Sequence, residues 1–565
     1  MIKERLKKLK DLLKKYNLDG YVVPKNDEFF SEFSNKDRLN VISNFKGSAG
    51  YAVILKNENY LFVDGRYTIQ ANIESGKNFK IVDYYKILNT NIFKNINLGI
   101  DPTLFTSNQL KKFFLKNNKV TIVNENLIDK IHKIKEKKFY PFYSLDKKVT
   151  GESHIQKILK ISSFLKKNKL DYLLITAPEN VAWILNIRGH DNPTSPIPNC
   201  RLLISKKKKI YLIVNKKKTA KLLREKKLKR KEIIDPKSFI NLFDKLNGNN
   251  IQIDEKTCSL YFEKILKAKF NVIKKEDPIY SLKSIKNEVE IKNMIDAHLI
   301  DGVALTKFLF WIKKKNKLNI TEFDAQNKLE YFRKQNPKYL FPSFDTIAGS
   351  GKNGAIVHYR ATKNKTKLLK KDEIFLCDSG GQYKYGTTDV TRTICFSNQE
   401  ENIKNIFTKV LKGHIAVVRS NLEKRKTGKL IDIEARKFLK KSGLNFKHGA
   451  GHGVGFFLNV HEGPQAISSS NSVEIKKGMI ISNEPGYYKK NKFGIRIENL
   501  VYVSKIKGKL SFKNLTLAPI EKDLINFKLL TKDEKNYIFN YHLEVYSKLS
   551  PFLSKNEKKW LAELI

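Results

Sequence analysis

The chain has 565 residues, more than one hydrophobic core accommodates, and at ~100–200 residues per domain it predicts three or four domains. Hydrophobic residues make up 41% and aromatic residues 11%, so the composition supports buried cores and excludes global disorder. With 109 Lys and Arg residues against 57 Asp and Glu residues, the formal net charge is +52, which raises nucleic acid or an anionic membrane as a partner.

The N-terminal segment predicts the first helix of a domain. Leu6, Leu9 and Leu13 recur at helical spacing, and charges throughout the segment leave no apolar region typical of a secretory signal. Uninterrupted apolar stretches stay well short of the ~18 residues that a transmembrane helix needs. The four cysteines form no C-x-x-C pair, which favours a reducing, cytoplasmic location over a disulfide framework.

Helix and strand patterns alternate over residues 1–147 and predict an α/β domain. The pattern restarts with a helix, a turn and a strand that mirror the N-terminus, so residues 148–283 are predicted to form a second copy of the same domain type. Residues 284–504 begin with a helix and continue with glycine-rich strand pairs that hold most of the chemically informative side chains. Residues 505–565 end in helical patterns and form a predicted C-terminal extension.

Residues 206–232 contain 14 basic and two acidic side chains. One interpretation of this segment is an anion-binding patch. The other is a strand and a helix with solvated lysine faces, which the spacing of Leu222 and Leu228 favours because both look like core positions. The structural interpretation is therefore the stronger one.

Two aspartates lie on neighbouring strand patterns. EIFLC leads to Asp378, TTDVTRTICF contains Asp389, and the glycines between them predict a turn that brings both carboxylates to one point. Taken alone, this pair also fits a hairpin with surface carboxylates. Further along, His448, His452 and His461 fall within fourteen residues of glycine-rich sequence, and such clustering favours a ligand over an ordinary core histidine.

Two glutamates follow apolar strands: Glu484 comes after MIIS, and Glu498 ends FGIRIE. Buried carboxylates are costly unless they are neutralised, so a purely structural role requires a separate Lys or Arg for each of the four acids. Two divalent cations would neutralise all four at once, with a histidine completing the ligand shell. This oxygen-rich donor set favours Mn²⁺, Co²⁺ or Fe²⁺, and two such ions can activate a bridging water.

The strings DSGGQYKYGTTDVTRT, GHGVGFFLNVHEGP and SNEPGYY, together with RLNVISNFKGSAGYAVIL, VAWILNIRG and FKNLTLAPI, carry a resemblance along nearly the whole chain. The sequence resembles the pita-bread metallopeptidases and, within them, the aminopeptidase P (Xaa-Pro aminopeptidase) family of the long, three-domain type. The resemblance implies two creatinase-like N-terminal α/β domains followed by an α+β pita-bread catalytic domain.

The resemblance also implies a dinuclear site and an activity. It implies two divalent ions, most often Mn²⁺ with Co²⁺, Fe²⁺ or Zn²⁺ as alternatives, and the following metal ligands: Asp378, Asp389, His452, Glu484 and Glu498. Asp389 and Glu498 would bridge the ions, and Glu484 would handle the proton of the attacking water. The implied reaction removes the N-terminal residue from peptides with proline in the second position, through attack of a metal-bridging hydroxide.

Further residues take roles by the same resemblance. His358 and His461 would contact the substrate, and His448 is a proton-relay candidate, with backbone hydrogen bonding in a glycine-rich bend as its alternative role. Tyr488 and Arg496 would line the proline pocket, with ordinary strand positions as their alternative. The implied partners are peptides with a free N-terminus and a second copy of the chain, bound through the catalytic and C-terminal region.

The sequence departs from the family in two strings. HDNPTSPIPNC replaces the usual segment after NIRG, which puts the preference for the first substrate residue in doubt, and Ala450 stands where the family has Thr, without loss of a ligand. Three other functions are alternatives to the aminopeptidase activity that the resemblance implies. A prolidase is disfavoured by the duplicated N-terminal half, and a creatinase-like relative or a non-catalytic binding module by the presence of all five ligands. We therefore expect neither a specific nucleic acid nor a membrane as a partner, and the charge indicates a solvated shell.

Overall fold

The computed structural model describes residues 2–34, 36–84, 93–114, 118–134, 140–315 and 319–565. The chain forms two compact units, Met1–Tyr280 and Ser281–Ile565. Within the described residues, no helix is long and apolar enough to cross a bilayer. The four cysteines are buried thiols.

The N-terminal unit begins with the predicted helix α1 (Ile2–Lys15), which buries Leu6, Leu9 and Leu13 against a mixed sheet. The sheet consists of β4 (Lys80–Asp83), β3 (Asn59–Val63), β2 (Tyr51–Leu55), β1 (Gly20–Pro24), β5 (Asn97–Ile100) and β6 (Lys119–Ile122), in that order. The connecting helices are α2 (Arg38–Ser43), α3 (Thr68–Ser75), α4 (Ser107–Phe113) and α5 (Leu127–Ile131). β1 pairs antiparallel with β2 and parallel with β5.

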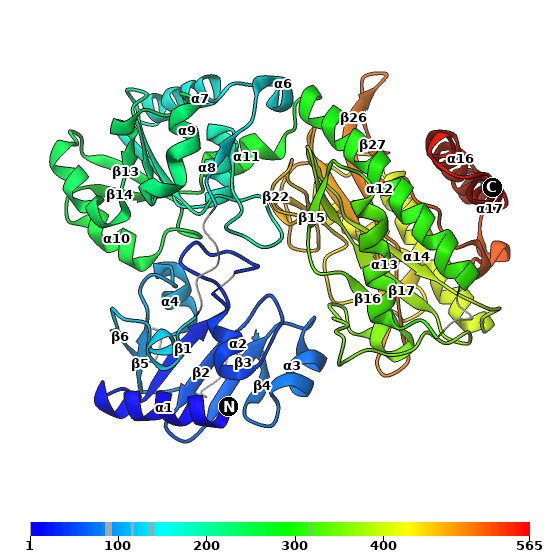
Figure 1. Ribbon diagram of the computed structural model, residues 1–565, viewed down its shortest axis with the longest axis horizontal. Coiled ribbons are helices and arrows are strands. Elements are labelled where there is room, and N and C mark those ends of the chain that lie inside the picture. Colours follow the sequence, from blue (N-terminus) through cyan, green and yellow to red (C-terminus); the bar gives the residue numbers. More distant parts are fainter. Residues whose placement is uncertain (1, 35, 85–92, 115–117, 135–139, 316–318) are drawn as a thin grey trace. The chain divides into compact units, whose positions relative to one another are not determined.

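A second sheet in the same unit repeats this topology (Figure 1, cyan to green). Its order is β12 (Ile233–Ile234), β11 (Ile210–Ile213), β10 (Arg201–Ser205), β8 (Tyr172–Ile175), β13 (Asn250–Ile253) and β14 (Asn271–Lys274). Its helices are α6 (Lys147–Thr150), α7 (His154–Lys167), α8 (Pro178–Leu185), α9 (Ala220–Arg224), α10 (Leu260–Lys267) and α11 (Pro278–Ser284), and β7 (Tyr143–Ser144) pairs with β9 (Ile187–Arg188). β8 pairs antiparallel with β10 and parallel with β13, as β1 does with β2 and β5. The expected fold class of this half, two α/β domains of one type, is confirmed.

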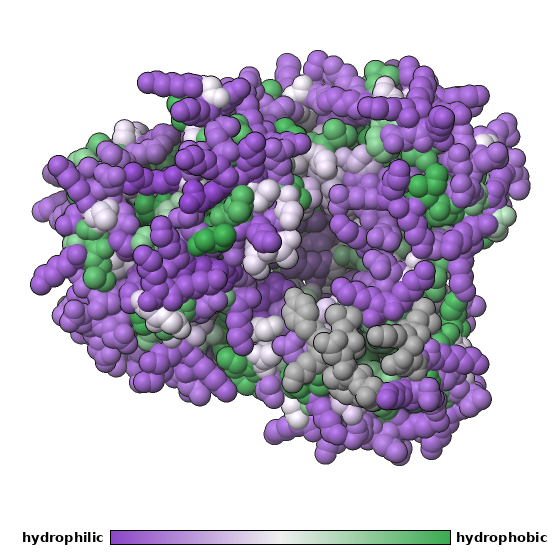
Figure 2. Space-filling model, turned by 180° about the vertical axis from the view of Figure 1, so that it is seen from behind, coloured by the Kyte–Doolittle hydropathy of each residue, from purple (hydrophilic) through white to green (hydrophobic). Residues whose placement is uncertain are grey.

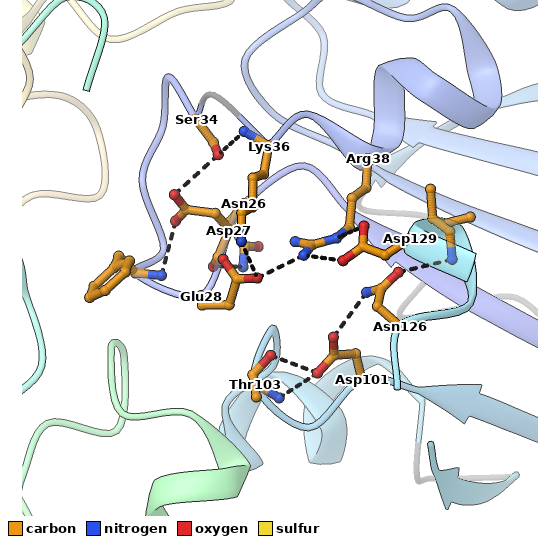
Figure 3. Close-up of polar contacts among 12 residues, drawn as sticks. Asn26, Asp27, Glu28, Ser34, Lys36, Arg38, Asp101, Thr103, Asn126 and Asp129 are labelled. Atoms are coloured by element: carbon orange, nitrogen blue, oxygen red, sulfur yellow. Dashed lines mark hydrogen bonds and ion pairs between the residues drawn. The ribbon is translucent and has the colours of Figure 1, made fainter. Parts of the chain in front are cut away.

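Polar side chains order the loops at the carboxyl ends of β1, β5 and β6 (Figure 3). Asp101, which follows β5, accepts hydrogen bonds from the Thr103 amide at 2.9 Å and from Asn126 Nδ2 at 2.9 Å. In the second repeat, Asp254 follows β13 and accepts from the Lys256 and Asp277 amides at 2.7 and 2.9 Å. The contact to the amide two residues on recurs in both repeats, whereas the second donor is the Asn126 side chain in one and the Asp277 backbone in the other. The aspartate after the strand is thus a structural feature of the repeat.

The lysine-rich segment 206–232 forms β11 and α9 of the second repeat. Leu222 and Leu228 are buried, whereas lysines such as Lys207 and Lys217 are exposed. The molecular face in Figure 2 is likewise dominated by hydrophilic residues, with hydrophobic ones scattered among them. These observations support solvated lysine faces around an apolar core.

The C-terminal unit is built from α-helices and several antiparallel sheets. Its helices are α12 (Glu288–Lys315), α13 (Glu322–Lys334), α14 (Glu401–Val418), α15 (Gly428–Lys440), α16 (Lys532–Leu549) and α17 (Lys555–Ala562). Figure 1 shows α16 and α17, in red, at the edge of this unit next to the C-terminus. A large apolar core joins α14 and α15 to the neighbouring strands through Phe407, Leu411, Leu439, Ile481 and Val501.

The strands of this unit lie in four sheets in the described part of the chain. One three-stranded sheet has the order β16 (Ile347–Ser350), β17 (Phe375–Ser379), β20 (Val390–Ile394), and another has the order β15 (Tyr339–Pro342), β18 (Gly381–Tyr383), β19 (Gly386–Thr387). The five-stranded sheet has the order β22 (Glu462–Ile467), β21 (Gly451–Gly453), β23 (Ile480–Asn483), β26 (Asn499–Ile506), β27 (Lys509–Asn514). The two-stranded sheet pairs β24 (Gly486–Lys489) with β25 (Phe493–Arg496).

The connection between the two aspartate strands differs from the predicted turn. β17 and β20 do pair antiparallel, but the chain between them enters another sheet as β18 and β19. The departure occurs at Gly380, where a Cβ atom would lie 2.0 Å from the Thr388 carbonyl oxygen. A close backbone approach of this kind requires glycine. Glycine at this position therefore reflects the close approach and not a simple hairpin turn.

Candidate metal centre

Two acids come from the first strand pair of the C-terminal unit. Asp378 lies in β17 opposite Thr391 of β20, and Asp389 immediately precedes β20. Both carboxylates are buried, with residue exposures of 7% and 4%. The antiparallel pairing therefore brings residues eleven positions apart to the same end of one sheet.

The remaining acids and a histidine come from the second part of the unit. His452 lies in β21, which pairs with β23, and Glu484 directly follows β23. Glu498 lies between β25 and β26, and its amide donates to the Thr391 carbonyl oxygen at 3.1 Å. This backbone hydrogen bond attaches the Glu498 segment to the strand that follows Asp389.

The five predicted ligands gather at one place. Ligand atoms of Asp389, His452 and Glu498 all lie within 4.8 Å of one another. His452 Nε2 is 3.5 Å from a carboxylate oxygen of Asp389 and 3.5 Å from Oε1 of Glu484. Asp378 is close enough for the charges of Asp389 and Glu484 to raise its pKa. These five residues are called the ligand cluster below.

The electrostatics of the ligand cluster show a deficit of positive charge. Burial, with the charges of neighbouring acids, raises the pKa of Asp378 to about 7 and that of Glu498 well above its ordinary value. Burial alone would lower the pKa of His452, but Asp389 and Glu484 raise it to about 9. Without a bound cation, the cluster therefore holds protons near neutral pH.

The donor atoms fit a divalent cation. Asp378 Oδ1 is buried without a hydrogen-bond partner among the described residues, although Oδ2 is paired. His452 Nδ1 lies 2.9 Å from the Gly453 carbonyl oxygen, which can hold the proton on Nδ1 and leave Nε2 to face the carboxylates. A backbone carbonyl behind a histidine is the usual support of a metal-binding imidazole. Oxygen donors with one imidazole suit hard divalent ions.

Arg496 is a basic side chain that contacts the ligand cluster directly. Its Nη2 donates to Asp378 Oδ2 at 2.6 Å, its Nε to Thr391 Oγ1 at 3.1 Å, and its Nη1 to the Tyr488 hydroxyl at 2.6 Å. His448 Nε2 lies 2.8 Å from the same hydroxyl, and its Nδ1 lies 2.7 Å from the Gly449 carbonyl oxygen.

The direction of this chain of hydrogen bonds follows from the partners. Burial lowers the pKa of His448 to about 4, so the ring is neutral and carries one proton, which the carbonyl oxygen requires on Nδ1. His448 Nε2 then accepts from the Tyr488 hydroxyl, which itself accepts from Arg496. The chain fixes the guanidinium that faces Asp378.

The other two predicted histidines take different positions. The His461 ring stands edge-on to the His452 ring, with centroids 4.4 Å apart, and the residue is exposed. His358 is half-buried and follows the short helix η6 (Gly351–Ala355). His461 thus lies directly beside a predicted ligand, while His358 belongs to a separate loop.

Sequence reasoning missed two residues that support the ligands. Thr391 Oγ1 donates to Glu498 Oε2 at 2.7 Å. Ser482 Oγ accepts from the His452 amide at 2.9 Å and donates to Glu484 Oε1 at 3.2 Å. Thr391 is two residues from Asp389, and Ser482 is two residues from Glu484. This short separation in the sequence is the signal that could have identified both residues.

The sequence matches known family descriptions along its length. Residues 292–505 match Metallopeptidase family M24, and residues 508–564 match the C-terminal region of peptidase M24. Residues 5–131 and 135–290 each match the Creatinase/Prolidase N-terminal domain. The fold and the site thus define a metallopeptidase catalytic unit preceded by two creatinase-type domains, which confirms the expected fold class.

Relatives match over nearly the full chain. A probable Xaa-Pro aminopeptidase P of Laccaria bicolor is 36% identical over 600 residues, covering 99% of this chain and 92% of that protein. Xaa-Pro aminopeptidase 1 of Dictyostelium discoideum is 36% identical over 610 residues, covering 100% of this chain and 96% of that protein. The chain therefore belongs to metallopeptidase family M24.

Solved structures agree with this assignment. X-prolyl aminopeptidase from Caenorhabditis elegans, a cytosolic enzyme with a di-nuclear active site, has a TM-score of 0.92 and 29% identity, covering 100% of this chain and 99% of that one. A prolidase from Thermococcus sibiricus has a TM-score of 0.53 and 26% identity, covering 66% of this chain and 98% of that one.

Proposed function

We propose that this protein is a metalloaminopeptidase that releases the N-terminal residue from peptides with proline in the second position. The observation that carries the proposal is the ligand cluster itself, three buried carboxylates, one partly buried carboxylate and a histidine with too little positive charge nearby. Relatives named Xaa-Pro aminopeptidase that match along nearly the whole chain support the substrate class. The prolidase similarity covers less of the chain, which favours the aminopeptidase over the dipeptidase.

The residues that would hold two divalent cations are the five of the ligand cluster, with Asp389 and Glu498 shared between the ions. The hard, oxygen-rich donors favour Mn²⁺, with Co²⁺, Fe²⁺ and Zn²⁺ as alternatives. Bound there, the ions supply Lewis acidity and lower the pKa of a bound water.

The chain's own side chains handle protons and substrate. Burial alone would raise the pKa of Glu484, but the neighbouring histidines and Arg496 lower it, so its carboxylate is ionised and can accept a proton. Ser482 holds one of its oxygens by a hydrogen bond at 3.2 Å. His461 and His358 would contact the substrate carbonyl groups, and His448, which is 3.9 Å from Glu484, would relay a proton.

Proline in the second position has no N–H and a restricted φ, so its pocket needs an apolar wall and no acceptor for an amide. We place Tyr488 and Arg496 beside this pocket: the Tyr488 ring would supply apolar surface, and the Arg496 guanidinium lies 5.8 Å from the ring centroid. We further propose a cytoplasmic homodimer that assembles through the catalytic and C-terminal region and requires neither nucleic acid nor a membrane.

The deciding experiment couples metal analysis to peptide cleavage. The purified protein is loaded with Mn²⁺ and assayed on a tripeptide with proline in the second position, on the matching Xaa-Pro dipeptide and on the tripeptide with alanine in place of proline. We expect about two metal ions per chain and rapid cleavage of the proline tripeptide. Cleavage of the dipeptide alone would identify a prolidase instead, and salt-dependent DNA binding without peptidase activity would identify a binding module.

A further inference from the structure

Glu322 is the first residue of α13, and its side chain is fully buried. Oε1 accepts from the Ser350 amide at 2.8 Å and from Asn353 Nδ2 at 2.9 Å. Oε2 accepts from the Tyr359 hydroxyl at 2.8 Å and from the Lys367 amide at 3.1 Å. One carboxylate thus accepts hydrogen bonds from four residues of a single segment, residues 350–367.

The donors to Glu322 are amides and a hydroxyl rather than a basic side chain. Burial raises the pKa of Glu322, while the hydrogen bonds from Ser350, Asn353 and Tyr359 lower it. A buried carboxylate without its donors is costly, so each of these contacts holds the loop against α13. The main role of Glu322 is therefore to order this loop through hydrogen bonds, and not to pair with a basic side chain.

The loop that Glu322 orders carries His358. Asn353 precedes this histidine and Tyr359 directly follows it, so both sides of His358 are attached to the same carboxylate. Tyr359 also belongs to a small apolar cluster against which Tyr488 packs. The loop is therefore coupled to the residue that contacts Arg496 and His448.

The backbone of the same loop approaches β25 closely. A Cβ atom added at Gly494 would lie 1.8 Å from the Gly354 carbonyl oxygen. Two glycines thus allow the loop to lie directly on the strand that ends in Arg496. The position of His358 relative to the ligand cluster depends on these backbone contacts and on Glu322.

We propose that Glu322 is a positioning residue for His358, and this inference rests on the proposed function in which His358 contacts the substrate. Glu322 does not reach the substrate itself. It sets the distance between the imidazole and the reacting carbonyl group through the Asn353 and Tyr359 contacts. A misplacement of ~1 Å costs about 10²-fold in rate at such sites.

Glu322→Gln is the informative substitution because it preserves size. Oε1 and Oε2 each accept a backbone amide, from Ser350 and Lys367, so either orientation of the glutamine places an NH₂ group against an N–H donor. One attachment of the loop is lost while α13 keeps its length and packing. We expect kcat/KM for the proline tripeptide to fall ~10–100-fold with unchanged metal content.

The test is a double-mutant cycle with Glu322→Gln, His358→Ala and the double variant. If Glu322 acts through His358, Glu322→Gln lowers kcat/KM ~10–100-fold in the wild type but less than ~3-fold when His358 is alanine. Equal losses in both backgrounds overturn the positioning role and leave the proposed function intact.

Glu521→Gln is the matched control. Glu521 is also a buried glutamate of this unit, and its carboxylate pairs with Lys313 at 2.9 Å rather than with the His358 loop. Its effect on kcat/KM is expected to be small and the same whether residue 358 is histidine or alanine. Coupling to His358 as large as that of Glu322 would show a general loss of stability and would overturn the inference.

Hydrogen exchange separates failure of this inference from failure of the proposed function. Glu322→Gln is expected to accelerate amide exchange in residues 350–361 while that of α14 stays unchanged. If the wild type does not cleave the peptide, the proposed function fails. In that case unchanged exchange overturns the ordering role of Glu322, and faster exchange retains it.

Discussion

Two groups of charged side chains in the C-terminal unit invite comparison: carboxylates paired with basic residues, and the ligand cluster. Glu462 of β22 is almost fully buried, and it contacts the ammonium groups of Lys283, at 3.2 Å, and Lys286. Asp301 is also buried and pairs with the Arg333 guanidinium at 2.8 Å. Each of these carboxylates has its own basic partner, which offsets the loss of hydration.

The ligand cluster is also largely buried, with Glu484 and His452 partly exposed, but its charges are not balanced in this way. Its four carboxylates share the guanidinium of Arg496 and the imidazole of His452. In this unit a structural buried carboxylate has either its own cation, as Glu462 and Asp301 do, or a full set of uncharged hydrogen-bond donors, as Glu322 does. Where the charge exceeds the available cations, metal binding is the consistent explanation, and the following predictions test that difference.

The largest expected effect is the loss of a bridging carboxylate. Glu498→Ala or Asp389→Ala should remove metal and lower kcat/KM by about 10³-fold or more, because several kcal/mol of transition-state stabilisation disappear with the ions. The measurements are metal content by elemental analysis and cleavage of the proline tripeptide. Substantial activity at normal metal content in either variant would refute the shared-ligand assignment.

Loss of the structural carboxylate of Glu462 should lower stability independently of metal. Glu462→Gln removes the carboxylate charge that contacts the buried ammonium groups of Lys283 and Lys286, so we expect the free energy of unfolding to fall by about 3–5 kcal/mol, with or without metal. Denaturant unfolding of both forms measures this. Glu544→Gln is the control, since its exposed pair with Lys548 should contribute little. A loss confined to the metal-loaded form would place Glu462 with the metal centre instead.

The metal-free protein should lose stability as the pH rises. Asp378, with a pKa of about 7, and His452, with a pKa of about 9, both hold their protons more tightly when folded than when unfolded. Their stabilising contribution is present at low pH and is lost as the pH passes through these folded values. Thermal unfolding between about pH 5 and pH 9 tests this.

Two comparisons make the pH prediction decisive. Loading with Mn²⁺ should remove the decline, because the ions take the place of the protons. Asp378→Asn should remove the part of the decline below about pH 7 and keep the part above it. A metal-free wild type whose stability rises over the same range would contradict the charge deficit of the ligand cluster.

The smallest effect concerns the support of Arg496. Tyr488→Phe removes the hydroxyl between Arg496 and His448 but keeps the ring, so we expect a loss of about 1–2 kcal/mol in stability from the two unpaired groups. Metal content should stay normal, and kcat/KM should fall by less than ~10-fold. A loss of metal in this variant would show that Tyr488 holds the ligands rather than the guanidinium.

In the N-terminal half, sequence patterns were sufficient to predict the type of fold. The opening helix and the restart of the pattern at residue 148 predicted a repeated α/β domain, and the two sheets share one strand order and the same pairing directions. Such patterns are readable because burial imposes a periodicity on each element separately. The turn predicted between Asp378 and Asp389 was wrong because two strands of another sheet occupy it, and sheet membership depends on distant strands.

The short motifs identified the acids and the histidine string that are candidates for the metal centre, because each motif carries its carboxylates or its imidazole locally. Tertiary structure alone decided that Arg496 pairs with Asp378, that Thr391 supports Glu498, and that Glu322 holds both sides of the His358 loop. The physical reason is that a buried charge must be stabilised by whatever donors the fold brings to it, and these partners are far apart in the chain.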